Sequence, residues 1–407
     1  MRPEIAVTGL GLVTPAGHTV EDNWAGLCEG RSLATRDPGL EGLPVDFSCQ
    51  VPDFDAEREL GRSYALRVDR FIQFALVAAR RAVSHAGLDP RTWRGERVGV
   101  LLGVSSNSLD TYLPEFRHLG EDRADRVSRL MLPRSMLSMP AGEVGIDLGA
   151  RGPNFAPSSA CASGATAIGV ARDLLLSGAC DVVLAGGSES ARSRMMATCF
   201  ARLRALSRRR EDPGRASRPF DAARDGFVLG EGAAVLVMER LSDARARRAE
   251  VLAQLRGYGA SADAHHPIAP HPEGDGAARA ITAALEDAGC KPQDIGLVNA
   301  HGTSTRLNDA TEAAALAQVF GDRVPPVTAA KGVIGHALGA AGAIQAAYTV
   351  LALRHGVVPP VANFERQDGD HPLDVVAGEP RPTAADVGLS CSYGFGGQNA
   401  VLLFAAA

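Results

Sequence analysis

The sequence predicts an α/β protein in which helices cover a buried, mainly parallel β-sheet. Short runs of β-branched and apolar residues alternate with longer alanine-rich stretches of helical period. The composition, with 45% hydrophobic and 22% charged residues, is that of a folded protein rather than of a disordered or coiled-coil chain. The length of 407 residues is enough for about two or three domains of average size.

The expected strands are short apolar runs with the length of buried β-strands. In chain order they cover residues 5–9, 97–103, 181–185, 233–239, 252–258, 295–300, 326–329 and 387–393. The expected helices are the alanine-rich stretches at residues 67–86, 162–177, 276–288, 309–320 and 337–355. Gly178 and Gly289 follow two of these stretches, where a left-handed helix cap forms easily.

A charged segment, residues 240–251, separates two apolar strands near the middle of the chain. We therefore place a domain boundary near residue 250, which gives an N-terminal half of residues 1–250 and a C-terminal half of residues 251–407. Both halves contain strand, glycine-rich turn and helix units, but no residue-level repeat proves a duplication.

Several features predict a cytoplasmic protein that binds neither membrane nor nucleic acid. No apolar run approaches the roughly 18 residues that span a bilayer, and residues 5–13 look like a first strand rather than a signal peptide. The seven cysteines are scattered without a CxxC pair, which argues against a disulfide framework and a zinc site. The net charge of −5 excludes gross attraction to nucleic acid but leaves local basic patches open.

Basic residues are distributed unusually. The chain has 42 Lys+Arg residues, and the only lysines are Lys291 and Lys331. Seven arginines and two acidic residues lie within positions 202–218, so this segment is the most basic surface candidate. A solvated loop explains such a run equally well.

Cys161 is the first candidate for chemistry. It lies within residues 158–164, immediately before a helical stretch that begins with small residues. A thiol at a helix N-terminus is favoured as thiolate by the helix dipole and the free N–H groups. The alternative is that Cys161 is a small buried hydrophobic residue.

Two histidines stand at turns that lead into helices. His301 follows the expected strand 295–300, where α/β folds place ligands, and His336 lies in a glycine-rich turn before the stretch 337–355. Lys331 and Glu312 lie near them in sequence and could fix the tautomers and orientation of the imidazoles. Each histidine alone could be structural, and Lys331 and Glu312 could form a surface ion pair.

Residues 392–399 place three glycines around Phe395. Such a tight loop aims backbone N–H groups at one point, where an oxyanion is a natural guest. By itself this signal is weak, because glycine-rich loops are common at strand ends.

Taken together, these motifs resemble the beta-ketoacyl-acyl-carrier-protein synthases, the elongating condensing enzymes of the thiolase superfamily in bacterial fatty acid and type II polyketide synthesis. The resemblance covers nearly the whole chain in the family's order, including residues 7–15, 217–221 and 225–232. It implies a thiolase-like fold, in which two similar halves form a layered αβαβα sandwich. The nucleophilic cysteine would lie in the first half and the two histidines in the second.

The resemblance also implies roles for individual residues. Cys161 would take the acyl group from a carrier protein, and His301 and His336 would stabilise the enolate of a malonyl-type extender. The backbone N–H groups of Cys161 and Phe395 would hold the tetrahedral oxyanion, and Phe395 would act as a gate. Lys331 and Glu312 would support the histidines.

Substrate-binding residues follow from the same resemblance. Thr303 and Thr305 would hold the phosphopantetheine arm that carries the substrates, and Phe200 and Ser106 would line the acyl pocket. No cofactor bound by the enzyme itself is implied, and no metal is expected at the histidine-containing loop 263–271. An acyl carrier protein would dock on arginines at the following positions: Arg62, Arg67, Arg70, Arg202, Arg204 and Arg208.

Two departures from the family pattern bear on the substrate. Ser106 replaces a bulky aliphatic residue, and Gln398 replaces a threonine in the Gly-Phe-Gly-Gly motif. A small polar gate would admit longer, more polar or unsaturated chains, which favours a type II polyketide or polyene pathway over fatty acid elongation in primary metabolism.

Other members of the superfamily remain as alternatives. A non-elongating chain-length-factor subunit would lack the cysteine, a thiolase would use a second cysteine such as Cys391, and a pure decarboxylase would lack acyl transfer. The resemblance implies a homodimer or a heterodimer with a chain-length-factor-like subunit, and the sequence does not choose between them.

Overall fold

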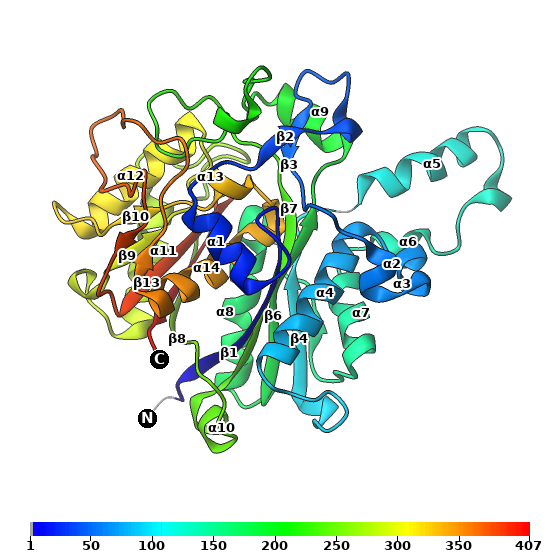
Figure 1. Cartoon of the computed structure of the whole chain (residues 1–407), viewed down its shortest axis with the longest axis horizontal. Helices are drawn as coiled ribbons and strands as arrows, with labels where there is room; N and C mark the ends of the chain where they lie inside the picture. The colour runs from blue at the N-terminus through cyan, green and yellow to red at the C-terminus, as the bar shows by residue number, and fades with distance from the viewer. Residues whose placement is uncertain (1–2, 107) are drawn as a thin grey trace.

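The computed structural model describes residues 3–106 and 108–407. Within them, a ten-stranded sheet runs through the molecule in the order β10-β9-β13-β14-β8-β1-β7-β6-β4-β5 (Figure 1). Its strands are β1 (Ile5–Val13), β4 (Val98–Gly103), β5 (Asn154–Phe155), β6 (Val182–Ser190), β7 (Glu231–Arg240), β8 (Ala253–Ala262), β9 (Leu297–Asn299), β10 (Val327–Thr328), β13 (Val387–Gly394) and β14 (Gln398–Ala405).

The sheet repeats one topology twice. The order β1-β7-β6-β4-β5 recurs as β8-β14-β13-β9-β10, with the same pattern of parallel and antiparallel neighbours. The two five-stranded halves join through a short antiparallel pairing between β1 and β8, in which Ile5 lies opposite Leu255 and Val7 opposite Ala253. The chain passes from the first half to the second between β7 and β8.

The prediction of a mainly parallel sheet is wrong. Only β4 with β5 and β6, and β9 with β10 and β13, pair in parallel, while the other neighbours are antiparallel. Parallel strands need a long crossover connection, whereas antiparallel strands can be joined by a tight turn. The turn from Gly394 to Gln398, which joins β13 to β14, is such a connection, and it contains Phe395.

Helices cover both faces of each half-sheet, so the predicted αβαβα sandwich is confirmed (Figure 1). α4 and α7 pack on the outer face of the first half, α11 and α12 cover the second half, and α8 and α14 lie between the halves. Their bounds are α4 (Arg70–His85), α7 (Met139–Leu148), α8 (Ser163–Leu176), α11 (Asp275–Ala288), α12 (Arg306–Phe320) and α14 (Ala341–His355).

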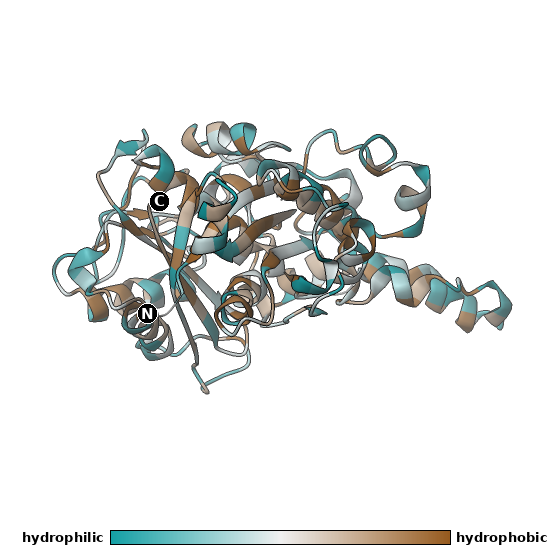
Figure 2. Cartoon of the chain, turned by 90° about the horizontal axis from the view of Figure 1, so that it is seen from below, coloured by the Kyte–Doolittle hydropathy of each residue, from teal (hydrophilic) through white to brown (hydrophobic). Residues whose placement is uncertain are grey.

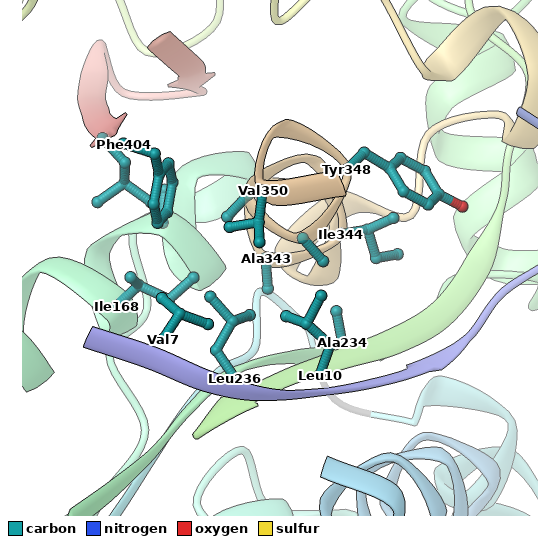
Figure 3. Packing of buried hydrophobic residues seen from close by; sticks show 14 of the residues in the cluster. Val7, Leu10, Ile168, Ala234, Leu236, Ala343, Ile344, Tyr348, Val350 and Phe404 are labelled. Carbon is teal, nitrogen blue, oxygen red and sulfur yellow. The ribbon is translucent and has the colours of Figure 1, made fainter. Parts of the chain in front are cut away.

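The central core lies between α14 and strands β1 and β7. Figure 3 shows Ile344 and Val350 of α14 facing Leu10 of β1 and Leu236 of β7. Each of these side chains is buried, and full burial of a side chain of this size is worth about 1.5–3 kcal/mol. The core therefore fixes the position of α14, whose first turn follows His336.

The two central helices approach each other at glycines. A Cβ atom on Gly164 of α8 would lie 2.7 Å from the backbone nitrogen of Ala343, and one on Gly342 of α14 would lie 2.7 Å from that of Ala165. Neither position has room for a side chain. This reciprocal contact brings the N-terminal ends of α8 and α14 together, and with them the turns that carry Cys161 and His336.

An arm that the sequence did not predict projects from the first half (Figures 1 and 2). It contains α5 (Leu109–Gly120) and α6 (Met131–Ser135), and it exposes large apolar side chains, among them Leu113 and Phe116. The remaining short elements include α1 (Val20–Cys28), α2 (Ala56–Leu60), α3 (Arg62–Arg67), α9 (Arg194–Arg202), α10 (Leu241–Ala246), α13 (Lys331–Ile334), β2 (Ala34–Arg36), β3 (Phe47–Cys49), β11 (Val357–Val358) and β12 (Arg381–Pro382). None of the helices in the described ranges is long and apolar enough to cross a membrane.

Candidate active site

Cys161 lies on a strained turn. It occupies the middle of a 3₁₀ turn (Ala160–Ala162) directly before α8, and Ala160 has a left-handed backbone with φ of 50°, which is uncommon for a residue with a side chain. The loop after β13 packs against this turn so closely that a Cβ atom on Gly394 would lie 2.6 Å from the carbonyl oxygen of Ser159. As a result, the backbone N–H of Phe395 donates toward the Cys161 sulfur.

One cavity of about 400 Å³ collects the predicted reactive residues. Cys161 comes from the first half, and His301, His336 and Phe395 come from the second. These four positions are up to 234 residues apart in sequence (395 − 161). Other predicted residues that line the cavity are Thr303, Thr305, Phe200 and Arg204.

The Cys161 thiol is not the resting thiolate that the helix position predicted. Burial is the largest influence and raises the pKa of Cys161 to about 11. The positive charge of Lys331 and the N–H of Phe395 act in the opposite direction but do not cancel the burial. The group therefore rests as a thiol at neutral pH and must lose its proton when it reacts.

The two imidazoles are close and buried. The ring centroids of His301 and His336 lie 5.5 Å apart with the planes nearly perpendicular, at 86°, and each residue is about 2% exposed. Burial lowers the pKa of both histidines well below the ordinary value, and the charge of Lys331 adds to this effect. Both rings are therefore neutral at neutral pH, and each carries one N–H donor.

Lys331 determines which nitrogen of His301 carries the proton. Its Nζ lies 3.2 Å from His301 Nδ1 and 2.6 Å from the His301 carbonyl oxygen. A lysine ammonium only donates, so Nδ1 must accept and the ring proton lies on Nε2. The contact between Lys331 Nζ and His301 Nδ1 thus supports the predicted role of Lys331.

Glu312 supports the backbone rather than an imidazole. Its two carboxylate oxygens accept hydrogen bonds from the backbone N–H groups of His301 at 2.7 Å and Gly302 at 2.8 Å. These bonds hold the turn that presents His301 to the cavity. Burial raises the pKa of Glu312.

The residues expected to bind the arm and the acyl chain fall into two groups. Thr303 and Thr305 line the cavity, and their hydroxyl oxygens lie 2.9 Å apart. Phe200 also lines it, with its ring centroid 6.2 Å from that of Phe395 and 5.2 Å from that of Phe227. Three aromatic rings thus stand together at one wall of the cavity.

Ser106 does not belong to this group. It is absent from the described residues that line the cavity, and its hydroxyl donates a hydrogen bond of 3.2 Å to the buried carboxylate of Glu189. Its place in the acyl pocket stays a prediction. Glu189 also accepts a hydrogen bond of 2.9 Å from the backbone N–H of Ser105. The charge of Glu189 in turn raises the pKa of Cys161, so Ser106 and Cys161 share this carboxylate as a neighbour.

Two of the six arginines expected to dock a carrier protein form ion pairs within the chain. Arg70 places both arms of its guanidinium on Glu231, at 2.9 and 2.8 Å, and Arg67 pairs with Glu143 at 2.6 Å. Both side chains stay partly exposed, at 41% for Arg67 and 33% for Arg70, so their part in docking stays a prediction. Arg62, at the start of α3, is exposed.

The arginine-rich segment 202–218 separates into two sets. Four of its arginines form ion pairs within the chain: Arg209, Arg210, Arg215 and Arg218. Arg202, Arg204 and Arg208 form no ion pair with the described residues and line a second pocket, and Arg204 also lines the cavity with Cys161. Arg204 is therefore shared by the two pockets, and Arg202 and Arg208 lie beside it in the second.

Gln345 is a residue of this site that the sequence analysis missed. It is about 1% exposed on α14, and its side-chain oxygen accepts a hydrogen bond from Lys331. The available signal was a single amide in an otherwise apolar helix, since a buried polar group needs partners. Phe227, whose ring lies 5.3 Å from that of His336, was also missed.

The described residues contain no group of three or more His, Cys, Asp or Glu side chains arranged to hold a metal ion. The loop 263–271 instead contributes His266 to the cavity wall. The ring nitrogen Nδ1 of His266 accepts two backbone hydrogen bonds within the loop, from Ile268 and Ala269.

Two family models match this chain. Residues 2–244 match the model described as beta-ketoacyl synthase, N-terminal domain, and residues 252–365 match beta-ketoacyl synthase, C-terminal domain. A 3-oxoacyl-[acyl-carrier-protein] synthase 2 from Synechocystis sp. is 41% identical over 408 residues, which covers 99% of this chain and 98% of that protein.

Solved structures of ketosynthases are also similar to this chain. The ishigamide ketosynthase/chain length factor superposes with a TM-score of 0.94 at 34% identity, and a ketosynthase of the AntDE:AntF complex with a type II polyketide acyl carrier protein superposes with a TM-score of 0.92 at 30% identity. Both comparisons cover 100% of each chain.

Proposed function

The chain belongs to the beta-ketoacyl synthase family, and from this premise we propose that Cys161, His301 and His336 are its catalytic residues. The protein is a beta-ketoacyl-acyl-carrier-protein synthase, which condenses an acyl thioester with malonyl-acyl carrier protein and releases carbon dioxide. The observation that supports the residue assignment is the shared cavity, because one thiol and two neutral imidazoles line it from opposite halves of the molecule.

In the first step, the Cys161 sulfur attacks the carbonyl carbon of the incoming acyl thioester and the thiol of the carrier arm leaves. The negative oxygen of the tetrahedral intermediate is held by the backbone N–H groups of Cys161 and Phe395, which already point at the sulfur. A single donor of this kind is worth about 2.7–4 kcal/mol of barrier. The strained turn at Ala160 holds the nucleophile in place for this attack.

In the second step, a malonyl extender enters the emptied arm site and loses carbon dioxide. His301 Nε2 and one nitrogen of His336 donate hydrogen bonds to the extender's thioester oxygen. The negative charge of the enolate develops on this oxygen, where both donors stabilise it. Neutral imidazoles suit this role because they keep their protons while the enolate forms. The enolate carbon then attacks the carbonyl carbon of the acyl group on Cys161, and the carbon–sulfur bond breaks. The Cys161 sulfur leaves as a thiolate and takes up a proton from water, and the β-ketoacyl product leaves on its carrier.

Both substrates reach the cavity on the phosphopantetheine arm of an acyl carrier protein, and Thr303 and Thr305 bind this arm near the mouth. No cofactor is bound by the enzyme itself. The solved relatives include a carrier complex and a ketosynthase/chain length factor, which support a carrier partner and a homodimer or heterodimer for this chain. We place the enzyme in the cytoplasm, where its free cysteines stay reduced.

The Cys161→Ala variant tests the nucleophile. We expect it to lose acylation and condensation completely but to keep part of the malonyl decarboxylation, because the two histidines act on the extender alone. Intact-mass measurement after incubation with an acyl-carrier thioester gives the first result, and release of carbon dioxide from malonyl-carrier protein gives the second.

The matched control is Cys199→Ala, which removes an exposed cysteine outside the cavity and should acylate normally. A stable mass increase in the Cys161→Ala protein would show that another residue is the nucleophile.

The pathway is a separate proposal, in which the enzyme extends polyene or polyketide chains. It is supported by the similarity to the ketosynthase of the AntDE:AntF complex, whose carrier protein belongs to a type II polyketide synthase. Conjugated acyl-carrier starters should be condensed with a higher kcat/KM than saturated starters of equal length, which product mass spectrometry measures. Equal or inverted preference would favour fatty acid elongation.

A further inference from the structure

Lys331 is a buried cation whose direct partners are all neutral. The residue is about 2% exposed. Its Nζ contacts three acceptors, namely His301 Nδ1 at 3.2 Å, the His301 carbonyl oxygen at 2.6 Å and the side-chain oxygen of Gln345. An ammonium has three N–H groups, so the charged form satisfies all three acceptors and has no donor left over.

No carboxylate among the described residues forms an ion pair with this ammonium. Glu312 is the acidic residue with the largest influence on it, but both Glu312 oxygens are engaged by the backbone N–H groups of His301 and Gly302. A buried charge without a contacting counter-ion is costly, and the burial lowers the pKa of Lys331.

Gln345 is oriented by its own hydrogen bonds. Its Nε2 group donates to the carbonyl oxygens of Ala300 at 2.8 Å and Cys391 at 3.1 Å. Both amide protons are therefore used on carbonyl oxygens, so the side-chain oxygen must face Lys331. A rotated amide would place its N–H groups against the ammonium and its oxygen against two carbonyl oxygens.

We propose that Gln345 is a positioning residue of the condensation, whose neutral amide holds the Lys331 ammonium on His301 Nδ1 without neutralising its charge. The charge is thereby left free to keep His301 and His336 in their neutral, donating form. Loss of the Lys331 proton, which weakens the hold on His301 Nδ1, sets the alkaline limit of the reaction. This inference rests on the roles proposed above for the two histidines.

The geometry explains why deprotonation would matter. A neutral amine has two N–H groups and one lone pair, so one of the three acceptors would face the lone pair. If that acceptor is His301 Nδ1, the contact that fixes the Nε2 proton is lost. The titratable groups that face Lys331 come from every element around it: Glu312 and Asp309 on α12, Cys391 on β13, Cys161 before α8, and His301 and His336 on their turns.

The lysine content of this chain allows a direct measurement. Because Lys331 and the exposed Lys291 are the only lysines, protein labelled with ¹³C at lysine Cε gives two lysine signals, and the Lys291→Arg variant leaves only that of Lys331. A pH titration of this signal in the full-length protein reports the protonation of Lys331 without any turnover.

Two variants of similar size should move this titration in opposite directions. Gln345→Glu places a carboxylate against Nζ and should raise the midpoint by about one to three pH units, the usual effect of an adjacent opposite charge. Gln345→Met removes an acceptor and should lower the midpoint. The alkaline limb of the kcat/KM profile for condensation should shift in the same direction as the midpoint in each variant.

If Gln345 had a purely structural role, the Lys331 titration and the pH profile would behave differently. Both variants would then lose activity while the Lys331 midpoint and the alkaline limb stayed in place, and this result would overturn the proposal. Midpoints that move while the alkaline limb does not would overturn it as well. Because the titration needs no substrate, these outcomes are distinct from a failure of the catalytic assignment, which the Cys161→Ala variant tests.

Discussion

The pKa of the Cys161 thiol is set by two opposing effects. The N–H of Phe395 and the charge of Lys331 stabilise a thiolate, and burial at the bottom of the cavity destabilises it. Burial is the larger effect, so the thiol form dominates at rest. This protects the nucleophile from oxidation and alkylation, because the thiolate is the reactive form of cysteine.

The state of Cys161 can be tested by alkylation. The rate of reaction with iodoacetamide should rise about tenfold for each pH unit between about pH 7 and pH 9, because only the small thiolate fraction reacts. Peptide mass spectrometry measures Cys161 separately from the exposed Cys199. A rate that reaches a plateau in this range would show that the N–H donors outweigh burial.

At the scale of single residues, the sequence identified the functional residues better than it identified the residues that they contact. Cys161, His301 and His336 were recognisable because each stands in a distinctive turn, and the structure brings all three to one cavity. Arg70 was predicted to lie on the docking surface, and the structure gives it a partner, Glu231, that the sequence did not predict. The direction of a long side chain depends on partners far away in sequence, and no local pattern encodes it.

At the scale of elements, the site depends on the contact between α8 and α14. Cys161 precedes α8 and His336 precedes α14, so the separation of these helices sets the separation of nucleophile and imidazole. The glycines at the contact leave no free space, since a Cβ atom on Gly342 would lie 2.7 Å from a backbone nitrogen of α8.

The Gly342→Ala variant should therefore push the helices apart. Overpacking a core typically costs about 1–3 kcal/mol, which outweighs the helix propensity gain of about 1 kcal/mol. We expect a lower free energy of unfolding in urea titrations. We also expect kcat/KM to fall by tenfold or more, because a displacement of about 1 Å at an active site can cost about a hundredfold.

Gly142→Ala is the matched control. Gly142 also lies inside a helix, α7, but the nearest atoms to an added Cβ are 3.9 Å away. This variant should be as stable as the parent or more stable by up to about 1 kcal/mol, with unchanged activity. Equal behaviour of the two variants would mean that the α8–α14 contact does not constrain the site.

The sequence predicted where most sheet strands and core helices lie, because apolar runs and alanine-rich stretches mark buried elements. It did not predict their directions. β14 joins β13 through a short turn and so runs antiparallel, a feature that depends on the connection rather than on the strand. The exposed arm of α5 and α6 was not among the expected helices. α5 contains Pro114, a residue that normally argues against a helix interior, and the exposure of Leu113 and Phe116 is not encoded in the local pattern.

At the scale of the whole molecule, the topology repeat explains the location of the active site. Cys161 lies between β5 and β6 and His336 lies between β10 and β13, which are equivalent connections in the two halves. Each residue precedes the central helix of its half, and the two central helices meet. The repeat is one of topology, so no residue-level repeat was needed for the two halves to build one cavity together.

The charge of the whole molecule also bears on substrate delivery. The net charge is −5, so an acidic carrier protein would be repelled at long range. Attraction must come from unpaired cations near the cavity, within a screening length of about 8 Å at physiological salt. Arg204 lines the cavity itself, Arg202 and Arg208 line the pocket that shares Arg204 with it, and none of the three carries a counter-ion among the described side chains.

A double variant, Arg202→Ala with Arg208→Ala, should raise KM for the carrier-bound substrate by about twofold to thirtyfold, since each surface ion pair contributes about 0.2–1 kcal/mol. It should leave the rate with a small pantetheine thioester unchanged, because that substrate has no protein surface to dock. Added salt should raise KM for the parent enzyme more than for the variant, since fewer charge pairs remain in the variant to be screened.

Arg215→Ala, which removes an arginine already paired with Glu365, is the control in the same segment. If it raised KM as much as the double variant, the effect would reflect general charge and not the pocket.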